Sequence, residues 1–256
     1  MKKILTFLIV LSFLMTSAVS AQSSMDFGFK FGGNRAKMSG DPSIFNLITA
    51  VLTTFTGAVE VDNDARIGLV GGAFLTINTS PNFSIQPEFL YSTKGMETKF
   101  RYLFNGVDYE TVLQIKLIYI EIPVLLKYKF STEGNFKPSF YVGPALGLNV
   151  SGNFTGEEGS EGGDALDLGE LDIANLTSTE FSAVIGGELG IAMGNTTLLL
   201  DLRYTAGLTT VFDDASFATA ITNNEWAFVD ANGIGDDMKN SGFSLSVGVS
   251  FPIGGN

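Results

Sequence analysis

Apolar and polar residues alternate with a period of two through most of the chain beyond residue 25. The alternation recurs in segments close to the length that a tilted membrane strand needs, about 9–11 residues. In the clearest segment, Ile, Val, Leu, Tyr and Phe fill the even positions, and Tyr, Glu, Pro and Lys fill most odd ones. Eight segments show this pattern: residues 26–32, 66–77, 83–92, 118–130, 140–149, 181–191, 198–208 and 243–251. Helix-period segments are nearly absent, so the pattern predicts an all-β chain.

The connections between these segments alternate between long and short. The long ones are residues 35–65, 95–108, 152–178 and 210–240, and the short ones are 78–82, 131–138 and 194–196. An up-and-down outer-membrane barrel with both ends in the periplasm has short periplasmic turns and longer extracellular loops. The sequence therefore predicts an eight-stranded antiparallel up-and-down transmembrane β-barrel.

The direction of the apolar face needs a separate argument, because a soluble ligand-carrying barrel gives the same alternation. A water-exposed sheet face usually carries many Lys and Glu residues. Here the polar face is mostly Gly, Ser, Ala and Gln with isolated charges. Such small side chains suit a narrow interior, which in an eight-stranded barrel is just wide enough for its own side chains. We therefore expect the apolar face to contact lipid.

The isolated charges of the polar face are candidates for an interior polar network. Its predicted members are Glu88, Glu121, Glu188, Arg203 and Lys127, with Lys30 as a further cation. We expect these carboxylates and cations to pair with each other and to plug the barrel. A proton or ion path through them is the less favoured interpretation.

Three prolines lie inside predicted strands: Pro87, Pro123 and Pro144. Each removes a ladder donor and suggests a bulge, so the pairing register can shift by one residue near them.

The first 21 residues have the composition of a signal peptide. Lys2 and Lys3 precede an apolar run that ends in small residues at Ala21. The run is shorter than the roughly 20 apolar residues of a membrane-spanning helix. We expect cleavage after Ala21, a barrel domain over residues 22–256, and export to the outer membrane of a Gram-negative type of cell.

Charge and composition exclude several functions. The chain has 15 Lys and Arg against 27 Asp and Glu, a formal net charge of −12, which disfavours nucleic acid as a partner. It has no Cys, so no disulfide is expected, and no His, which removes the commonest general base. No phosphate-binding glycine loop is present. We expect no enzyme activity and no cofactor.

Two of the long connections are strongly acidic. Carboxylates from them are candidates for cation or partner contact: Glu157, Glu158, Glu161, Asp164, Asp213 and Asp214. Clustered carboxylates can hold Ca²⁺ or Mg²⁺, but neither connection has the residue order of a calcium-binding hand. A solvated, self-repelling loop is favoured, and no metal site is predicted.

Residues 43–55 in the first long connection form an apolar run too short to span a membrane. This run could be a helix on the barrel rim, a segment that docks a partner, or a segment that packs against the protein's own loops.

Three strings of residues, in order along the chain, resemble the PorT-type outer-membrane beta-barrel family common in Bacteroidetes. They occupy residues 86–95 (QPEFLYSTKG), 119–128 (YIEIPVLLKY) and 141–144 (YVGP), and residues 29–34 (FKFGGN) add to them. The resemblance implies an eight-stranded outer-membrane barrel but no reaction, because the family covers a secretion-linked member and many barrels of unassigned role. Such barrels commonly finish on an aromatic strand residue. In this chain Phe251 is followed by five further residues, which departs from that pattern.

These observations favour a non-enzymatic outer-membrane barrel with acidic extracellular loops. Its expected role is surface contact, envelope structure or secretion, and its expected partners are outer-membrane lipid and a protein bound through the loops. The alternatives are a soluble periplasmic carrier of a small apolar ligand and a small channel.

Overall fold

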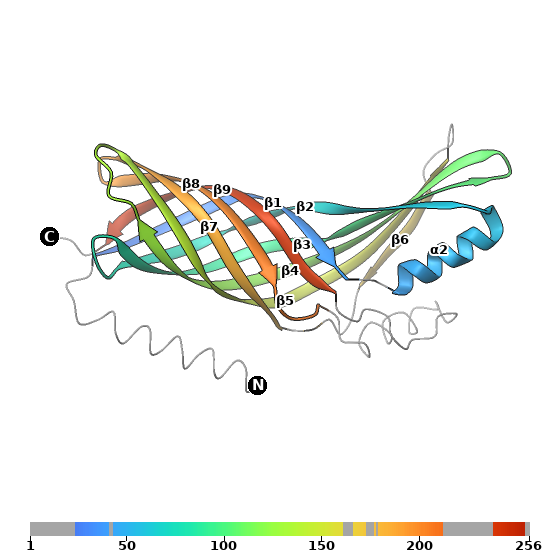
Figure 1. The fold of residues 1–256 in the computed structure, drawn as a ribbon, viewed down its shortest axis with the longest axis horizontal. Coiled ribbons are helices and arrows are strands. Elements are labelled where there is room, and N and C mark those ends of the chain that lie inside the picture. The colour runs from blue at the N-terminus through green and yellow to red at the C-terminus, as the bar shows by residue number, and fades with distance from the viewer. Residues whose placement is uncertain are drawn as a thin grey trace.

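The computed structural model describes residues 24–40, 43–160, 166–172, 177, 179–211 and 238–253. Eight antiparallel strands close into a ring, in which β1 pairs with both β2 and β9 (Figure 1). These strands are β1 (Met25–Ser39), β2 (Val59–Asn78), β3 (Phe83–Phe104), β4 (Val107–Lys129), β5 (Phe136–Ser160), β7 (Thr179–Met193), β8 (Thr196–Gly207) and β9 (Lys239–Ile253). A helix, α2 (Ser43–Thr56), and a short strand, β6 (Leu166–Asp172), complete the described elements. The predicted eight-stranded antiparallel barrel is confirmed.

The three short connections lie together at one end of the barrel, which we call the turn end (Figure 1). Here Met25 at the start of β1 pairs with Ile253 at the end of β9. The β7–β8 connection is a two-residue turn, because Met193 pairs with Thr196 across Gly194-Asn195. The predicted short turns therefore form one rim of the barrel.

At the opposite end, four strands continue well beyond the rest of the ring (Figure 1). This extension comprises residues 59–65 of β2, 95–104 of β3, 107–116 of β4 and 151–160 of β5. The predicted loop at residues 95–108 is wrong, since β3 and β4 stay paired to a two-residue turn at Asn105-Gly106. Both turn residues have positive φ, 51° and 80°, which a tight hairpin requires and Asn-Gly supplies.

The loop predicted at residues 152–178 is also partly strand. Strand β5 continues to Ser160, and β6 pairs only with its distal half. The described residues thus form nine strands, of which eight make the ring.

The outer face of the barrel changes from apolar to charged at one level. On β3, exposed Phe89 and Tyr91 are followed by Glu97 and Arg101. On β4 the change falls between Ile118 and Lys116, which pair with Thr93 and Gly95 of β3, so both strands change at the same height. Residues 83–93 cover about 34 Å of strand, or about 26 Å of height at a tilt near 40°, close to the apolar band of a membrane barrel. The expectation that the apolar face points outward is confirmed.

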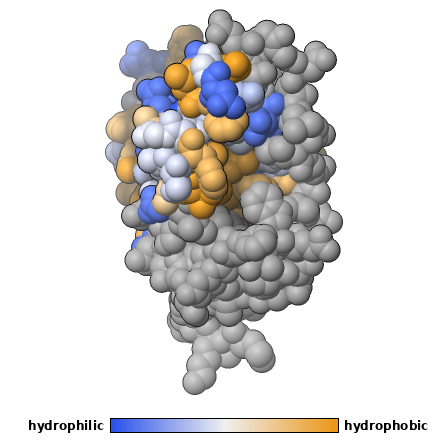
Figure 2. All heavy atoms as spheres, turned by 90° about the vertical axis from the view of Figure 1, so that its right-hand side faces the viewer, coloured by the Kyte–Doolittle hydropathy of each residue, from blue (hydrophilic) through white to orange (hydrophobic). Residues whose placement is uncertain are grey.

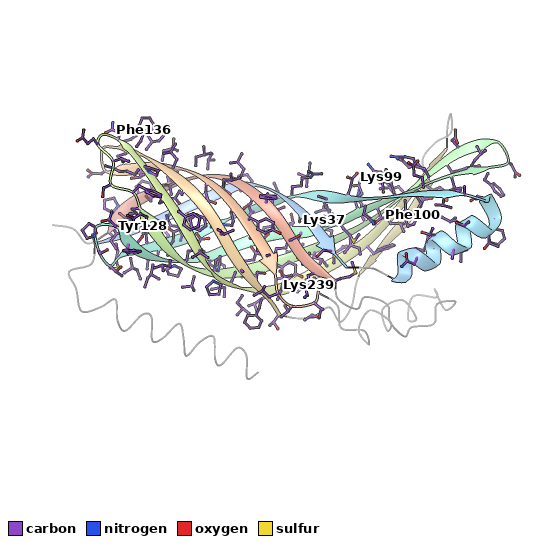
Figure 3. The ribbon with its side chains drawn as sticks, viewed as in Figure 1. Lys37, Lys99, Phe100, Tyr128, Phe136 and Lys239 are labelled. Atoms are coloured by element: carbon purple, nitrogen blue, oxygen red, sulfur yellow. The ribbon has the colours of Figure 1, made fainter. Side chains whose placement is uncertain are left out.

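The inner face changes at the same level from polar in the barrel to apolar in the extension. Inside the extension lies an apolar core formed by Met38, Met96, Phe100, Leu113, Ile115, Leu117, Tyr119, Val211 and Met238. Phe100 is fully buried in it, whereas Lys99 beside it belongs to the outer face (Figure 3). The extension therefore has a dry interior and a charged exterior, as a water-soluble protein has.

Helix α2 packs on this core through Ile48 and Leu52, while Val51 and Phe55 face away and are exposed. The run at residues 43–55 is thus a helix that packs against the protein's own strands. Apolar and polar side chains lie side by side at this end of the molecule (Figure 2). In the part of the chain that the structure describes, no helix is long and apolar enough to cross a membrane.

The register shifts do not fall at the prolines, contrary to the prediction. Pairing runs in constant register past Pro87, Pro123 and Pro144. A missing N–H removes one ladder bond, while the neighbouring bonds keep the strands aligned. In the ring the shifts lie instead between Ala65 and Val70 on β2 and at Ile118/Tyr119 on β4, where the extension leaves the barrel.

Candidate functional site

The barrel interior holds a buried charge network centred on Glu88 of β3. Its Oε1 lies 2.7 Å from Lys30 Nζ on β1, and its Oε2 lies 2.8 Å from Arg203 Nη1 on β8. Asp201 lies 3.8 Å from both cations and accepts a 2.7 Å hydrogen bond from Tyr141 OH. Period-two alternation places all these side chains on the inner face, so their burial follows from the sequence pattern.

A second pair adjoins this network toward the turn end. Lys127 Nζ of β4 lies 2.8 Å from Glu188 Oε1 of β7 and donates a 2.6 Å hydrogen bond to Gln86 Oε1. Gln86 in turn donates from Nε2 to Glu88 Oε1 at 2.7 Å. The two groups therefore form one layer, in which three cations balance three carboxylates among the described residues.

A separate layer lies nearer the extension. Lys94 Nζ is 2.5 Å from Glu121 Oε1 and 3.0 Å from Glu180 Oε1. Asn240 donates a 2.6 Å hydrogen bond to Glu180 Oε2, and the ammonium of Lys94 lies 5.0 Å from the centre of the Tyr119 ring. Within the described residues this layer has one cation and two carboxylates.

The structure thus places all five predicted network residues in the interior but divides them between two layers. Glu88, Arg203, Lys127 and Glu188 share the first layer, whereas Glu121 joins the second. The prediction missed Lys94, Glu180 and Asp201. Asp201 occupies an inner position of the predicted strand at residues 198–208, so the alternation could have found it, while Lys94 and Glu180 lie just outside the predicted strands at residues 83–92 and 181–191.

Tyr141 ties the first layer to the barrel wall. The Arg203 guanidinium lies 5.3 Å from the centre of its ring, and Arg203 Nε donates to its hydroxyl at 3.3 Å. The ring crosses Gly186 on β7, where an added Cβ would lie 2.4 Å from the Tyr141 oxygen. Glycine at this position therefore makes room for the ring.

The space between the two layers is small. A cavity of about 30 Å³ is lined by residues that include Asn34, Ser92, Lys94, Glu121 and Arg203. It has room for water molecules but not for a solute. At the level of the two layers, the described interior is therefore packed with paired charges, while a wider recess of about 430 Å³, lined by residues that include Thr76, Lys127, Ser139 and Glu188, lies at the turn end.

The acidic candidates of the long connections are only partly described. Glu157 and Glu158 lie on the distal half of β5, opposite Asp167 and Leu166 of β6. Glu161, Asp164, Asp213 and Asp214 lie outside the described residues. Among the side chains that are described, no three His, Cys, Asp or Glu residues form a group that could hold a metal ion.

The tip of the extension was not predicted as a site and is the second candidate. The Tyr102 and Tyr109 rings stack at 5.6 Å, and Leu103, Phe104 and Val107 beside them are exposed. Below the tip, several of the outer charges are paired: Arg101 lies 2.9 Å from Asp62 and 2.7 Å from Glu110, and Lys99 lies 3.1 Å from Glu97. The hydrogen bond to Glu97 and the charge of this carboxylate raise the pKa of Lys99. The tip is therefore an apolar patch on a charged stem.

Comparisons with known proteins agree with the barrel. Residues 20–213 match the family described as outer membrane protein beta-barrel domain. Similar solved structures include neisserial surface protein A (14% identity, 88% of this chain and 96% of that chain, TM-score 0.37). They also include OprG of Pseudomonas aeruginosa (10%, 91% and 98%, TM-score 0.40) and Ail of Yersinia pestis (9%, 89% and 99%, TM-score 0.34). A search of curated proteins found no match.

Proposed function

Because the chain belongs to the outer membrane protein beta-barrel domain family, we propose that it is a non-enzymatic outer-membrane barrel whose extension makes contacts at the cell surface. The observation that carries the proposal is the extension. Its strands continue for about 30 Å beyond the apolar belt, measured along the strand, and end in an exposed apolar tip. Exposed apolar patches usually mark contact sites.

The proposal includes the orientation and the route of the chain. Short turns face the periplasm and longer connections face outward in outer-membrane barrels, which puts the extension and the acidic segments outside the cell. Residues 1–21 act as the signal peptide in this scheme, and the apolar belt contacts membrane lipid. The PorT-type resemblance adds a secretion-associated role as one form that the contact could take.

The build of the tip supports contact with a protein. Tyr102 and Tyr109 offer rigid aromatic surface, and aromatic residues are enriched among the residues that dominate binding energy at interfaces. The apolar core below holds the hairpin in place, so little conformational entropy is lost when a partner binds. The filled interior and the outward apolar face disfavour the channel and the soluble carrier.

Site-specific photo-crosslinking on intact cells tests the contact role. A photoreactive residue replaces Phe104 at the tip, and a matched one replaces Ser131 at the turn end. We expect crosslinked products from position 104 that are absent at position 131. Position 104 would give nothing above position 131 if the tip contacted no partner, and the proposal would then be abandoned.

A shortened hairpin provides a second test that keeps the barrel intact. Removing residues 101–104 and 107–110 takes four residues from each strand and brings the Asn105-Gly106 turn to the pair Phe100–Thr111. The remaining pairs keep their register, and because the number removed is even, the turn again follows a pair of the same hydrogen-bonding type as Phe104–Val107. We expect this variant to fold, to shift mobility on boiling, and to lose the contacts of the wild type.

A structural role in the envelope is the second candidate, favoured by the packed interior. Cells with the shortened hairpin should then resist detergent as well as wild-type cells do, whereas cells without the protein should not. Under the contact proposal, detergent resistance does not separate these strains, and only crosslinking does.

A further inference from the structure

Three cations gather on the outer face of β1 and β9, directly beyond the apolar belt. Arg35 and Lys37 alternate with buried Ala36 and Met38, and Lys239 adjoins buried Asn240, so all three point outward. Lys37 and Lys239 lie where the barrel gives way to the extension (Figure 3). We call Arg35, Lys37 and Lys239 the boundary cations.

The pairing register places the boundary cations close together. Lys37 pairs with Ser241 and Ser39 pairs with Lys239, so Lys37 and Lys239 are diagonal neighbours, about 7–8 Å apart at the backbone. Arg35 is two residues from Lys37 on the same face, a distance of about 7 Å. Like charges on neighbouring positions of one sheet face repel each other, and an anion between them removes this repulsion.

The boundary cations differ from two of the outer cations of the extension, whereas Lys116 on β4 is likewise in no ion pair among the described residues. Lys99 and Arg101 each have carboxylate partners. None of the ion pairs among the described residues involves Arg35, Lys37 or Lys239. The chain as a whole has a net charge of −12, so a basic cluster with no ion pair among the described residues has the opposite charge to the rest of the protein.

The neighbours of the cluster are apolar and exposed. Arg35 pairs with Phe243 on one side and Ile67 on the other, with exposed fractions of 61% and 80%. One step further into the belt, Gly33 pairs with exposed Leu69 and Leu245. An acyl chain against these side chains brings its headgroup to the level of the cations, as basic residues next to a membrane segment attract anionic lipid.

We infer that the boundary cations bind the phosphate groups of a phosphorylated lipid in the leaflet next to the extension. The inference rests on the outer-membrane placement of the barrel and not on the proposed contact role of the tip. Two or three cations facing one phosphate form charge-assisted hydrogen bonds, and the adjoining belt supplies the apolar contact.

Lipid retention by the full-length protein tests the inference. The protein is placed in nanodiscs of phosphatidylcholine that contain either diphosphorylated lipid A or its dephosphorylated form, and bound lipid is counted by native mass spectrometry. The boundary variant is Lys37→Gln/Lys239→Gln, and Lys99→Gln/Arg101→Gln is the control that loses the same charge from the extension. Mobility shift on boiling, measured in phosphatidylcholine alone, verifies that each variant folds.

We expect the wild type to retain the diphosphorylated form in preference to the dephosphorylated one. The boundary variant should bind it about tenfold more weakly, and the control should bind it as the wild type does. Equal loss in both variants would mean general attraction, and displacement by inorganic phosphate would mean a site for soluble anions; either result overturns the inference. Loss of folding in neutral lipid by the boundary variant alone would also overturn it, because the cations would then serve the protein itself.

Discussion

Glu88 joins two cations on strands that are far from it in sequence, Lys30 at 58 residues and Arg203 at 115. All three side chains are nearly completely buried. A buried ion pair of this kind contributes little net stability, because burying both charges is costly. Removing the carboxylate alone is costly, because it leaves buried positive charge without enough negative charge beside it. The cost of losing Glu88 is therefore set by the cations that remain.

Replacing Glu88 by Ala should lower the free energy of unfolding by roughly 3–5 kcal/mol, because Lys30 and Arg203 stay buried with Asp201, 3.8 Å from each, as the one carboxylate left beside both. Urea titration followed by mobility shift on boiling measures the change. Glu110→Ala, which removes the half-exposed partner of Arg101, is the matched control and should change the midpoint little. Equal effects of the two substitutions would show that losing the buried carboxylate costs no more stability than losing the half-exposed one, which contradicts the prediction.

Gly95 lies at a position where the backbone conformation and the neighbouring strand both require glycine. Its φ is 139°, and an added Cβ would lie 1.8 Å from the carbonyl oxygen of Ile115. Gly95→Ala should cost at least about 1–3 kcal/mol of stability from backbone strain alone. At Gly134, where φ is 83° and nothing lies within 4 Å of an added Cβ, Ala should cost less. A smaller loss at Gly95 than at Gly134, in the same urea titration, would contradict the clash.

At the scale of elements, α2 is held to the extension by one face only. Ile48 and Leu52 pack on the apolar core, whereas Val51 and Phe55 are exposed. A short helix has little stability of its own in water, so its order depends on this packing.

Leu52→Glu should release α2 while the barrel stays folded. Limited proteolysis should then cut between residues 43 and 56 much faster, with the mobility shift on boiling unchanged. Phe55→Glu places the same charge on the exposed face and should leave the cleavage rate as in the wild type. If both variants were cut equally fast, the packing of Leu52 would not be what orders the helix.

The elements could be predicted from the sequence wherever the outer face is apolar. Residues 95–104 also alternate, with Met96, Thr98 and Phe100 inward and charged residues outward. A search for strands with an apolar outer face assigns this segment to a loop, because its outward residues are charged. Asn105-Gly106 is nevertheless a strong hairpin signal. The pairs Lys94–Glu180 and Lys94–Glu121 could not be predicted, because they depend on the strand register and tilt of the closed ring.

For the whole molecule, the level at which the outer face changes is a membrane boundary that can be measured. Phe89 lies within the apolar belt and Lys99 lies beyond it, on the same face of the same strand. The two positions therefore differ in the surrounding medium and not in the direction of the side chain.

Tryptophan at position 89 should be quenched strongly by brominated lipid, and tryptophan at position 99 should not. Each substitution, Phe89→Trp or Lys99→Trp, is made with Trp226→Phe, because the chain has one native Trp. Fluorescence in vesicles of brominated and ordinary phosphatidylcholine gives the comparison. Similar quenching at both positions would place the extension within the bilayer and contradict the boundary.

Strands β3 and β4 each run from the lipid belt into water. The two parts of one strand are therefore stabilised in different ways. In the belt, backbone amides are kept from water by lipid and by closure of the ring, while in the extension they depend on the small core around Phe100. The extension can therefore melt by itself, unzipping from the Asn105-Gly106 turn down to the level of Gly95, where the closed ring stops it. Its amides should exchange hydrogen in a faster cooperative group than those of the same strands a few residues further on, so heat or denaturant would remove the outward-reaching part of the molecule before it opened the barrel.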